Sequence, residues 1–206
     1  MVLTGRPRVE DQDDVSRRVR TALLVASACA ALSACAGGGA GSPVSPIVAP
    51  LAGTVSSGLI PVADRRPAPT LRGELVAGGQ LDTASLAGKI IVLNFWASWC
   101  SPCIAESPNL VEVANATKAS GVEFVGVDIK DEKAAARRHE RRFKVPYPSI
   151  YDDRGTNLLR FRALVPQSPP TTILVDRQGR IAARFIQGVT VDELSQPLQR
   201  LIAEQG

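Results

Sequence analysis

The chain has 206 residues, of which 45% are apolar and 21% are charged. This length supports one domain with a hydrophobic core and is thin for two, and the composition excludes disorder throughout. All nine aromatic residues lie after residue 94, so the core belongs to the second part of the chain. The net charge of +4 is mild and the basic residues are scattered, which does not favour nucleic-acid binding.

The first 34 residues have the pattern of an export signal. Arginines at 17, 18 and 20 precede an apolar segment over 21–31, which is shorter than the roughly 20 apolar residues of a membrane-spanning helix. The sequence Leu-Ser-Ala-Cys that follows resembles the lipobox of bacterial lipoproteins, which implies cleavage before Cys35 and lipidation of Cys35. The alternative is a plain secreted protein cut at a small-residue site. Both interpretations put the domain outside the cytoplasm, lipid-anchored to the cell membrane or released.

The segment 35–68 has the composition of a flexible tether. It is made mainly of Gly, Ser, Ala, Pro and Val, and it has no aromatic residue and no charge before Asp64. Such a segment buries too little surface to offset the entropy of ordering it. We therefore expect the folded domain to span 69–206.

Hydrophobic periodicity over this domain predicts alternating strands and helices. The expected elements begin with a hairpin over 71–81 with a Gly78-Gly79 turn, a strand over 89–95, a helix over 101–119 and a strand over 122–128. They continue with a helix over 131–143 capped by Asp131, an extended segment over 147–151, a short helix over 157–162, a strand pair over 171–176 and 181–186, and a helix over 191–203 capped by Thr190. This order predicts an α/β fold around a mixed sheet.

Two cysteines stand where the first central strand ends and a helix begins. Cys100 and Cys103 are separated by Ser101 and Pro102, a spacing that allows a disulfide across one helical turn. The positive end of the helix favours a thiolate on the first cysteine, so we expect Cys100 to be the nucleophile and Cys103 the resolving thiol. The predicted chemistry is thiol–disulfide exchange through a mixed disulfide. Pro102 fits the first helical turn, and Ser101 adds no charge.

The segment IIVLNFWASWCSPC resembles thioredoxin, and specifically the TlpA/ResA branch (DsbE-type) of membrane-anchored thioredoxin-like lipoproteins. The resemblance covers about residues 68–204. It implies a thioredoxin fold, with a mixed central sheet flanked by helices and an N-terminal β-hairpin extension.

The resemblance also implies roles for residues around the two thiols. Asn94 occupies the position of a buried acid in thioredoxin, and Asn is usual in the TlpA-like group. Glu106 matches an acidic residue beside the thiols in ResA-like proteins, which makes it the candidate for proton transfer with Cys103. The competing interpretation is that Glu106 is a solvated residue of the first helical turn.

Two further positions match the contact surface of the family. Trp99 matches the active-site tryptophan, and Pro170 matches the cis-proline that faces the active site. The family's backbone at this proline pairs with the substrate like an added strand. Pro169 departs from the pattern, because a proline before Pro170 has no amide hydrogen to donate.

The family resemblance implies an extracytoplasmic thiol-disulfide oxidoreductase, with a protein disulfide reductase favoured. Its substrates would be protein thiols and disulfides, including those of apocytochrome c, and its electrons would come from a membrane thiol transporter of the DsbD or CcdA type. The alternatives are an oxidase that forms disulfides in exported proteins and a non-catalytic lipoprotein adaptor. We expect no cofactor, because the two sulfurs carry the electrons.

A metal site is not expected, since the mature chain offers a single histidine, His139, in a polar helix. The basic cluster over 137–142 around it is interpreted as a solvated helix face, with a partner or anionic-lipid surface as the alternative.

Overall fold

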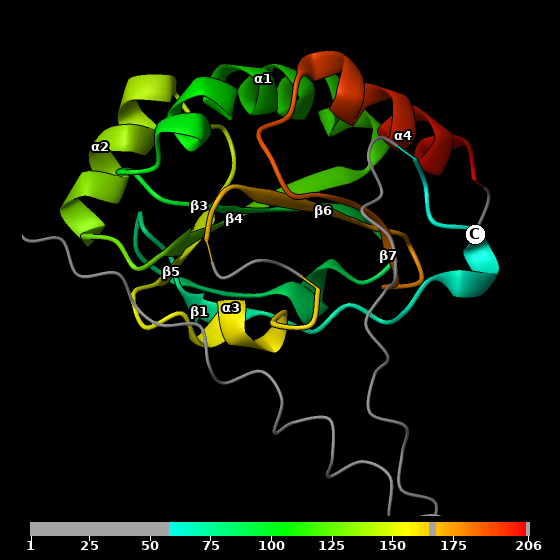
Figure 1. Ribbon diagram of the computed structural model, residues 1–206, viewed down its shortest axis with the longest axis horizontal. Helices are drawn as coiled ribbons and strands as arrows, with labels where there is room; N and C mark the ends of the chain where they lie inside the picture. Colours follow the sequence, from blue (N-terminus) through cyan, green and yellow to red (C-terminus); the bar gives the residue numbers. More distant parts are fainter. Residues whose placement is uncertain (1–57, 165–167, 205–206) are drawn as a thin grey trace, which may run out of the picture. The chain divides into compact units, whose positions relative to one another are not determined.

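The computed structural model describes residues 58–164 and 168–204. Its central sheet has five strands in the order β5-β4-β3-β6-β7 (Figure 1). β3 runs parallel to β4 and antiparallel to β6, so the sheet is mixed as predicted. The strands are β3 (Ile90–Trp96), β4 (Val122–Ile129), β5 (Ser149–Asp152), β6 (Thr171–Val175) and β7 (Ile181–Phe185).

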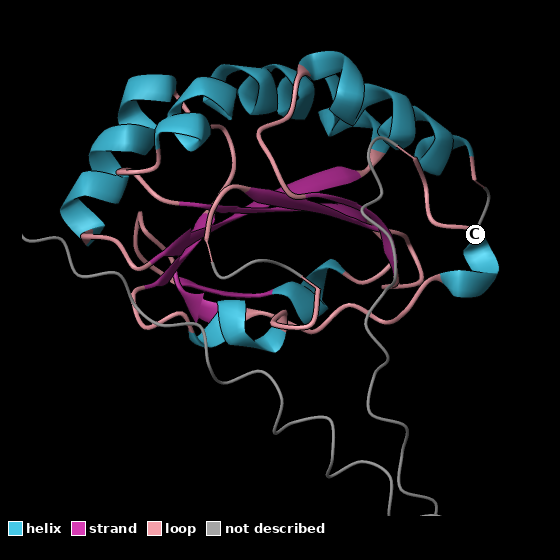
Figure 2. Cartoon of the chain, viewed as in Figure 1, coloured by secondary structure: helices cyan, strands magenta, loops and turns pink. Residues whose placement is uncertain are grey.

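Helices cover both faces of this sheet (Figure 2). α1, α2 and α4 lie on one face, and α3 lies with β1 on the other (Figure 1). The predicted N-terminal hairpin is present as the antiparallel pair β1 and β2. The bounds are β1 (Arg72–Glu74), β2 (Gln80–Asp82), α1 (Ser101–Thr117), α2 (Lys133–Phe143), α3 (Thr156–Arg160) and α4 (Val191–Ala203), with short 3₁₀ helices at Val62–Asp64, Thr83–Leu86 and Lys118–Ser120.

The core forms on the two faces of β3, because successive side chains of a strand point to opposite sides. Leu93 and Phe95 pack into the cluster beneath α3 that also holds Phe161. Ile90 and Val92 pack into the cluster under α1 and α4. Every residue of β3 is buried, which explains its nearly continuous apolar sequence. The thioredoxin fold predicted from the sequence is confirmed.

The expectation that Asp131 caps the second helix is wrong. α2 begins at Lys133, and its cap residue Glu132 makes no side-chain capping bond. Asp131 instead accepts hydrogen bonds from the backbone N–H and the hydroxyl of Ser98, at 2.5 and 3.0 Å. Its carboxylate therefore ties the loop before Cys100 to the start of α2. The sequence pattern predicted a bond between Asp131 and the end of its own helix, but the side chain binds Ser98, which lies 33 residues earlier.

The predicted end of the tether at residue 68 is also wrong, because residues 58–68 pack on the domain. Ile60 is buried and donates its N–H to the carbonyl of Ala182 at 2.7 Å. The buried Arg65 guanidinium pairs with Asp176 at 3.1 Å and with Glu204 at 2.7 Å. These partners lie more than 100 residues away in the sequence, so local composition does not reveal them. The predicted signal segment 1–34, Cys35 and the tether residues before 58 lie outside the described residues.

We expect Arg65→Met to destabilise the domain by about 3 kcal/mol, because it leaves the buried Asp176 carboxylate with one cation fewer. Asp176 keeps its pair with Arg180, which puts the cost at the low end for a broken buried pair. Urea unfolding of the full chain measures the change. Arg66→Met, at the exposed neighbouring position, is the matched control and should cost under about 0.5 kcal/mol. Equal losses in the two variants would contradict the buried ion pair.

Candidate active site

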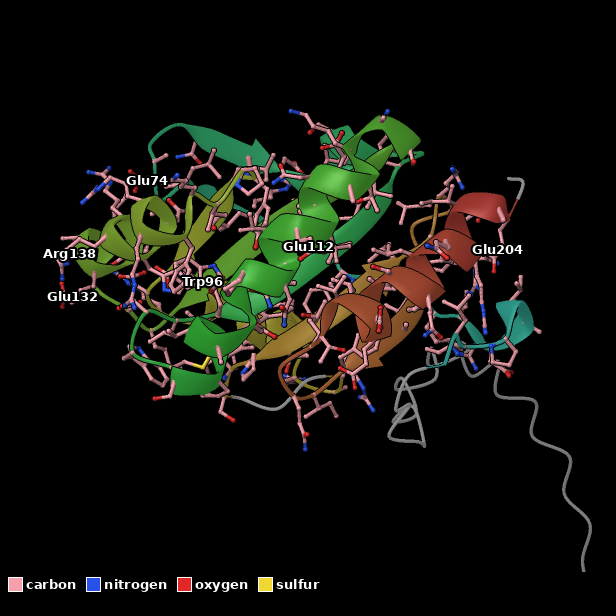
Figure 3. The ribbon with its side chains drawn as sticks, turned by 90° about the horizontal axis from the view of Figure 1, so that it is seen from above. Glu74, Trp96, Glu112, Glu132, Arg138 and Glu204 are labelled. Carbon is pink, nitrogen blue, oxygen red and sulfur yellow. A yellow bond between two sulfur atoms is a disulfide. The ribbon has the colours of Figure 1, made fainter. Side chains whose placement is uncertain are left out.

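The two predicted thiols form a disulfide at the beginning of α1 (Figure 3). The chain leaves β3 at Trp96 and enters α1 at Ser101, so four residues connect the strand to the helix. Cys100 is the cap residue of α1, and its Sγ accepts the backbone N–H of Cys103 at 3.2 Å. Pro102 lies in the first turn, where an amide hydrogen has no partner to lose. A negative charge on Cys100 would meet both this N–H and the positive end of α1.

The disulfide is buried, but residues next to it in the sequence are exposed. Cys100 and Cys103 are both buried, whereas Trp99 is 57% exposed. The indole N–H of Trp99 donates to the carbonyl of Lys130 at 3.1 Å, which fixes the ring beside the thiols. Ser101 and Pro102 are exposed as well. A partner molecule can therefore reach this end of α1.

The predicted cis-proline is confirmed, since the Pro169–Pro170 peptide bond is cis. Thr171, the first residue of β6, pairs with Phe95 near the end of β3. Pro170 therefore lies at the same end of the sheet as the loop that carries Cys100. Pro170 is buried, and neither it nor Pro169 has a backbone N–H.

Glu106 is buried, so its interpretation as a solvated residue is wrong. The side chain is 3% exposed and shares a face of α1 with Cys103, three residues earlier. Asn94 donates to Oε1 at 2.9 Å, and the N–H of Val189 donates to Oε2 at 3.1 Å. Burial outweighs these two bonds and raises the pKa of Glu106 to about 7. The carboxyl is thus poised to gain or lose a proton near neutral pH.

His139 is also buried, which corrects the interpretation of 137–142 as a wholly solvated face. Its ring lies 4.5 Å from that of Trp96, and its Nε2 lies 2.9 Å from Ser107 Oγ. Ser107 donates its hydroxyl to the carbonyl of Cys103 at 2.7 Å, so His139 Nε2 is the donor in this pair. Burial lowers the pKa of His139 and favours the neutral ring. The ring links α2 to the cysteine-bearing turn of α1.

Asp128 is a second buried acid that the sequence analysis did not single out. It pairs with Trp96 across β3 and β4 and is fully buried. Neither of its carboxyl oxygens has a hydrogen-bond partner among the described residues. Burial, followed by the nearby charge of Asp131, raises the pKa of Asp128 to about 9, so the group is neutral at pH 7. The only feature of the sequence that could have indicated its place near the site is its position at the end of a predicted strand.

No helix in the described part of the chain is long and apolar enough to cross a membrane. Over the same residues, no group of three or more His, Cys, Asp or Glu side chains is arranged to hold a metal ion.

The chain matches the model of the AhpC/TSA family over residues 65–184. It is 29% identical to the thiol-disulfide oxidoreductase ResA of Bacillus cereus over 124 residues, which are 60% of this chain and 70% of the relative. It is 34% identical to the thiol:disulfide interchange protein HelX of Rhodobacter capsulatus over 116 residues, which are 56% of this chain and 62% of HelX.

Solved structures agree with these relatives. A DsbF homologue from Corynebacterium diphtheriae superposes with a TM-score of 0.65 at 31% identity, covering 69% of this chain and 90% of the homologue. A secreted thiol-disulfide isomerase from Corynebacterium glutamicum gives a TM-score of 0.67 at 28% identity, covering 71% and 91%. With the Cys100–Cys103 disulfide at the start of α1, these matches show that the chain belongs to the AhpC/TSA thioredoxin-fold family and resembles the ResA-like, DsbE-type thiol-disulfide oxidoreductases within it.

Proposed function

We propose that this thiol-disulfide oxidoreductase is a protein disulfide reductase in which Cys100 is the nucleophile and Cys103 the resolving thiol. The observation that carries the proposal is the N–H of Cys103 donated to Cys100 Sγ at the positive end of α1, which favours the Cys100 thiolate. Cys103 is more deeply buried and has no comparable donor among the described residues, so it suits the second step.

The reaction transfers two electrons and needs no cofactor. The Cys100 thiolate attacks one sulfur of a substrate disulfide, forming a mixed disulfide and releasing the other substrate sulfur as a thiolate. The Cys103 thiolate then attacks Cys100 Sγ, which closes the Cys100–Cys103 disulfide and releases the second substrate thiol. The substrate is reduced, and the protein ends in the oxidised form seen here.

Glu106 is proposed to take the proton from Cys103 before that second attack. It lies one turn from Cys103 on the same face of α1, and its pKa of about 7 allows it to accept a proton near neutral pH. The hydrogen bonds from Asn94 and Val189 hold the carboxyl in place without supplying a full positive charge.

The modest stabilisation of the Cys100 thiolate supports the reductive direction. A strong oxidant owes its potential to a highly stabilised reduced form. Here Ser101 and Pro102 contribute no charge, Cys100 receives one backbone N–H, and the Glu106 carboxylate opposes further negative charge nearby. These features favour a reducing potential.

The proposed setting is the outer side of the cell membrane. Cleavage before Cys35 and lipidation of Cys35 would anchor the domain by the segment 35–57, and a membrane thiol protein of the DsbD or CcdA type would return electrons to Cys100. Protein disulfides are the substrate class, and apocytochrome c is included through the resemblance to the TlpA/ResA branch. The solved relative from C. glutamicum, which its description calls secreted, supports an extracytoplasmic location.

A disulfide-forming oxidase is the second candidate. It is favoured by the similarity to the secreted isomerase of C. glutamicum and to the DsbF homologue of C. diphtheriae. The same two sulfurs would then accept electrons from exported proteins. A non-catalytic adaptor is the third interpretation, and the trapping experiment below tests it.

We expect Cys103→Ser to accumulate a mixed disulfide with insulin, because the resolving thiol is absent. Mass spectrometry of the full chain should show the adduct and its loss on adding dithiothreitol. Cys100→Ser is the control and should form none, while the unaltered protein should accelerate insulin reduction by dithiothreitol. No adduct with Cys103→Ser and no acceleration would favour the adaptor.

We expect Glu106→Gln to slow resolution of the mixed disulfide about tenfold at pH 7.5, since Gln accepts no proton. In the unaltered protein the rate should rise as pH passes about 7, where Glu106 ionises. In the variant the rate should rise only nearer the thiol pKa of about 8.5. Stopped-flow rates from pH 5 to 9 measure both profiles. Glu112→Gln, at an exposed position on α1, is the matched control (Figure 3), and superimposable profiles for all three proteins would contradict the role of Glu106.

We expect a reduction potential nearer that of thioredoxin, about −270 mV, than that of DsbA, about −120 mV. Equilibration of the full chain in dithiothreitol and glutathione buffers, with thiol alkylation as the readout, gives the value. A potential close to that of DsbA would overturn the reductive direction and support the oxidase.

A further inference from the structure

A hollow of about 230 Å³ lies against the loop before Cys100, between α2 and the start of α1. It is lined by Ser98 of the loop before Cys100, by Ile104 of α1, and by four residues of α2: Ala135, Arg138, His139 and Arg142. The α2 residues are spaced by three and four, so they share one side of the helix. We call this hollow the α2 groove.

The lining of the α2 groove is basic. Arg138 and Arg142 are exposed, and neither makes an ion pair with any described residue. The Arg142 guanidinium lies over the ring of Phe143 at 5.1 Å, a contact that does not neutralise its charge. His139 contributes a neutral ring at the base. Among the residues that line the groove there is no carboxylate.

Asp131, an acidic group close to His139 in the loop before α2, is already engaged. Asp131 accepts two hydrogen bonds from Ser98 and one from the N–H of Glu132. Its oxygens are thus directed at the loop and the helix start, and it is not among the lining residues. The two guanidinium groups therefore present unpaired positive charge to a ligand in the groove.

The groove lies within reach of a polypeptide bound to Cys100. Ser98 precedes Cys100 by two residues, so their Cα atoms are at most about 7.6 Å apart. An extended chain advances about 3.3 Å per residue. The side chain two or three residues from a substrate cysteine, once that cysteine is joined to Cys100, therefore lies about as far away as the groove.

We propose that the α2 groove binds an acidic segment of the substrate polypeptide, with an Asp or Glu side chain placed two or three residues from the reactive cysteine. The proposal rests on the thiol-disulfide exchange proposed above and assigns a substrate class to the same site. Arginine binds a carboxylate through two parallel hydrogen bonds, which suits a single acidic side chain.

A membrane surface fits the groove less well. Recognition of anionic lipid typically uses clusters of about four to eight basic residues. Of the arginines in 137–142, Arg137 donates to the carbonyl of Val76, and Arg141 lies off the groove side of the helix. Two arginines next to the reactive loop match a peptide side chain better than a lipid layer.

The test compares two peptide disulfides that differ at one or two positions near the cysteine, Glu in one and Gln in the other. The reduced full chain should react with the Glu peptide about three- to tenfold faster at low ionic strength. The preference should fall as salt is added, because salt screens exposed charges. The Arg138→Gln/Arg142→Gln variant should show a Glu-to-Gln rate ratio close to one.

The matched control is Arg141→Gln/Arg160→Gln, which removes the same charge from two exposed positions outside the groove. It should keep the preference of the unaltered protein. Equal rates with both peptides, or a preference that survives in the Arg138→Gln/Arg142→Gln variant, would overturn the proposal while leaving the exchange reaction intact.

A binding measurement separates the groove from the reaction. The Cys100→Ser/Cys103→Ser full chain is titrated with a cysteine-free Glu peptide and its Gln counterpart, followed by the fluorescence of Trp96 and Trp99. Tighter binding of the Glu peptide that is lost with Arg138→Gln/Arg142→Gln supports the groove even if no exchange occurs, in which case only the proposed function fails. No difference between the peptides counts against the groove.

Vesicles of phosphatidylglycerol and of phosphatidylcholine supply the last comparison. We expect the full chain and its Arg138→Gln/Arg142→Gln variant to bind each kind of vesicle to the same extent. Loss of phosphatidylglycerol binding in this variant, without any peptide preference, would assign the groove to a lipid headgroup and overturn the proposal.

Discussion

Strand β3 is hydrogen-bonded along both edges, to β4 and to β6, and all seven of its residues are buried. Four residues connect its end to α1, and the last of them, Cys100, is the cap residue of that helix. A strand held on both edges and both faces cannot shift without breaking two ladders and two clusters of the core. The position of Cys100, and with it the alignment of its sulfur with the N–H of Cys103, depends on that constraint. The loop is held further by Asp131, which binds Ser98 from the side of α2.

The same burial has a cost at the site, because it also encloses two carboxyl groups. Glu106 and Asp128 both have pKa values above those of the unfolded chain, so the folded state binds more protons than the unfolded state at intermediate pH. The contribution of these two groups to stability is therefore lost as pH rises, from about 4 through 7 for Glu106 and through 9 for Asp128. Glu106 accepts hydrogen bonds from Asn94 and Val189, which hold its carboxyl in place. Asp128 has no hydrogen-bond partner among the described residues, and its raised pKa keeps it neutral at pH 7.

Local patterns in the sequence were sufficient for the parts of the fold that depend on neighbours in the chain. The run of apolar residues in β3, the capping box at Thr190 and the spacing of Cys100 and Cys103 all follow from short segments. The burial of Arg65 did not, because its partners Asp176 and Glu204 come from the far end of the chain. The burial of His139 was not predicted for the same reason. His139 lies in a charged helix and is buried only because Trp96 and Ser107 meet it from other elements.

The surface around the disulfide has two sides with different properties. On the side of β6, Pro169 and Pro170 offer no backbone N–H, so a substrate that pairs there as an added strand gains fewer hydrogen bonds than a chain with one proline would give. On the side of α2, the guanidinium groups of Arg138 and Arg142 make no ion pair with any described residue and line the α2 groove. Side-chain contacts on α2 can compensate for the missing backbone donors without touching the residues that set the chemistry of the thiols. If the α2 groove binds substrate as proposed, substrate choice and sulfur reactivity depend on separate elements, and substitutions along the exposed side of α2 are expected to change the first while leaving the second intact.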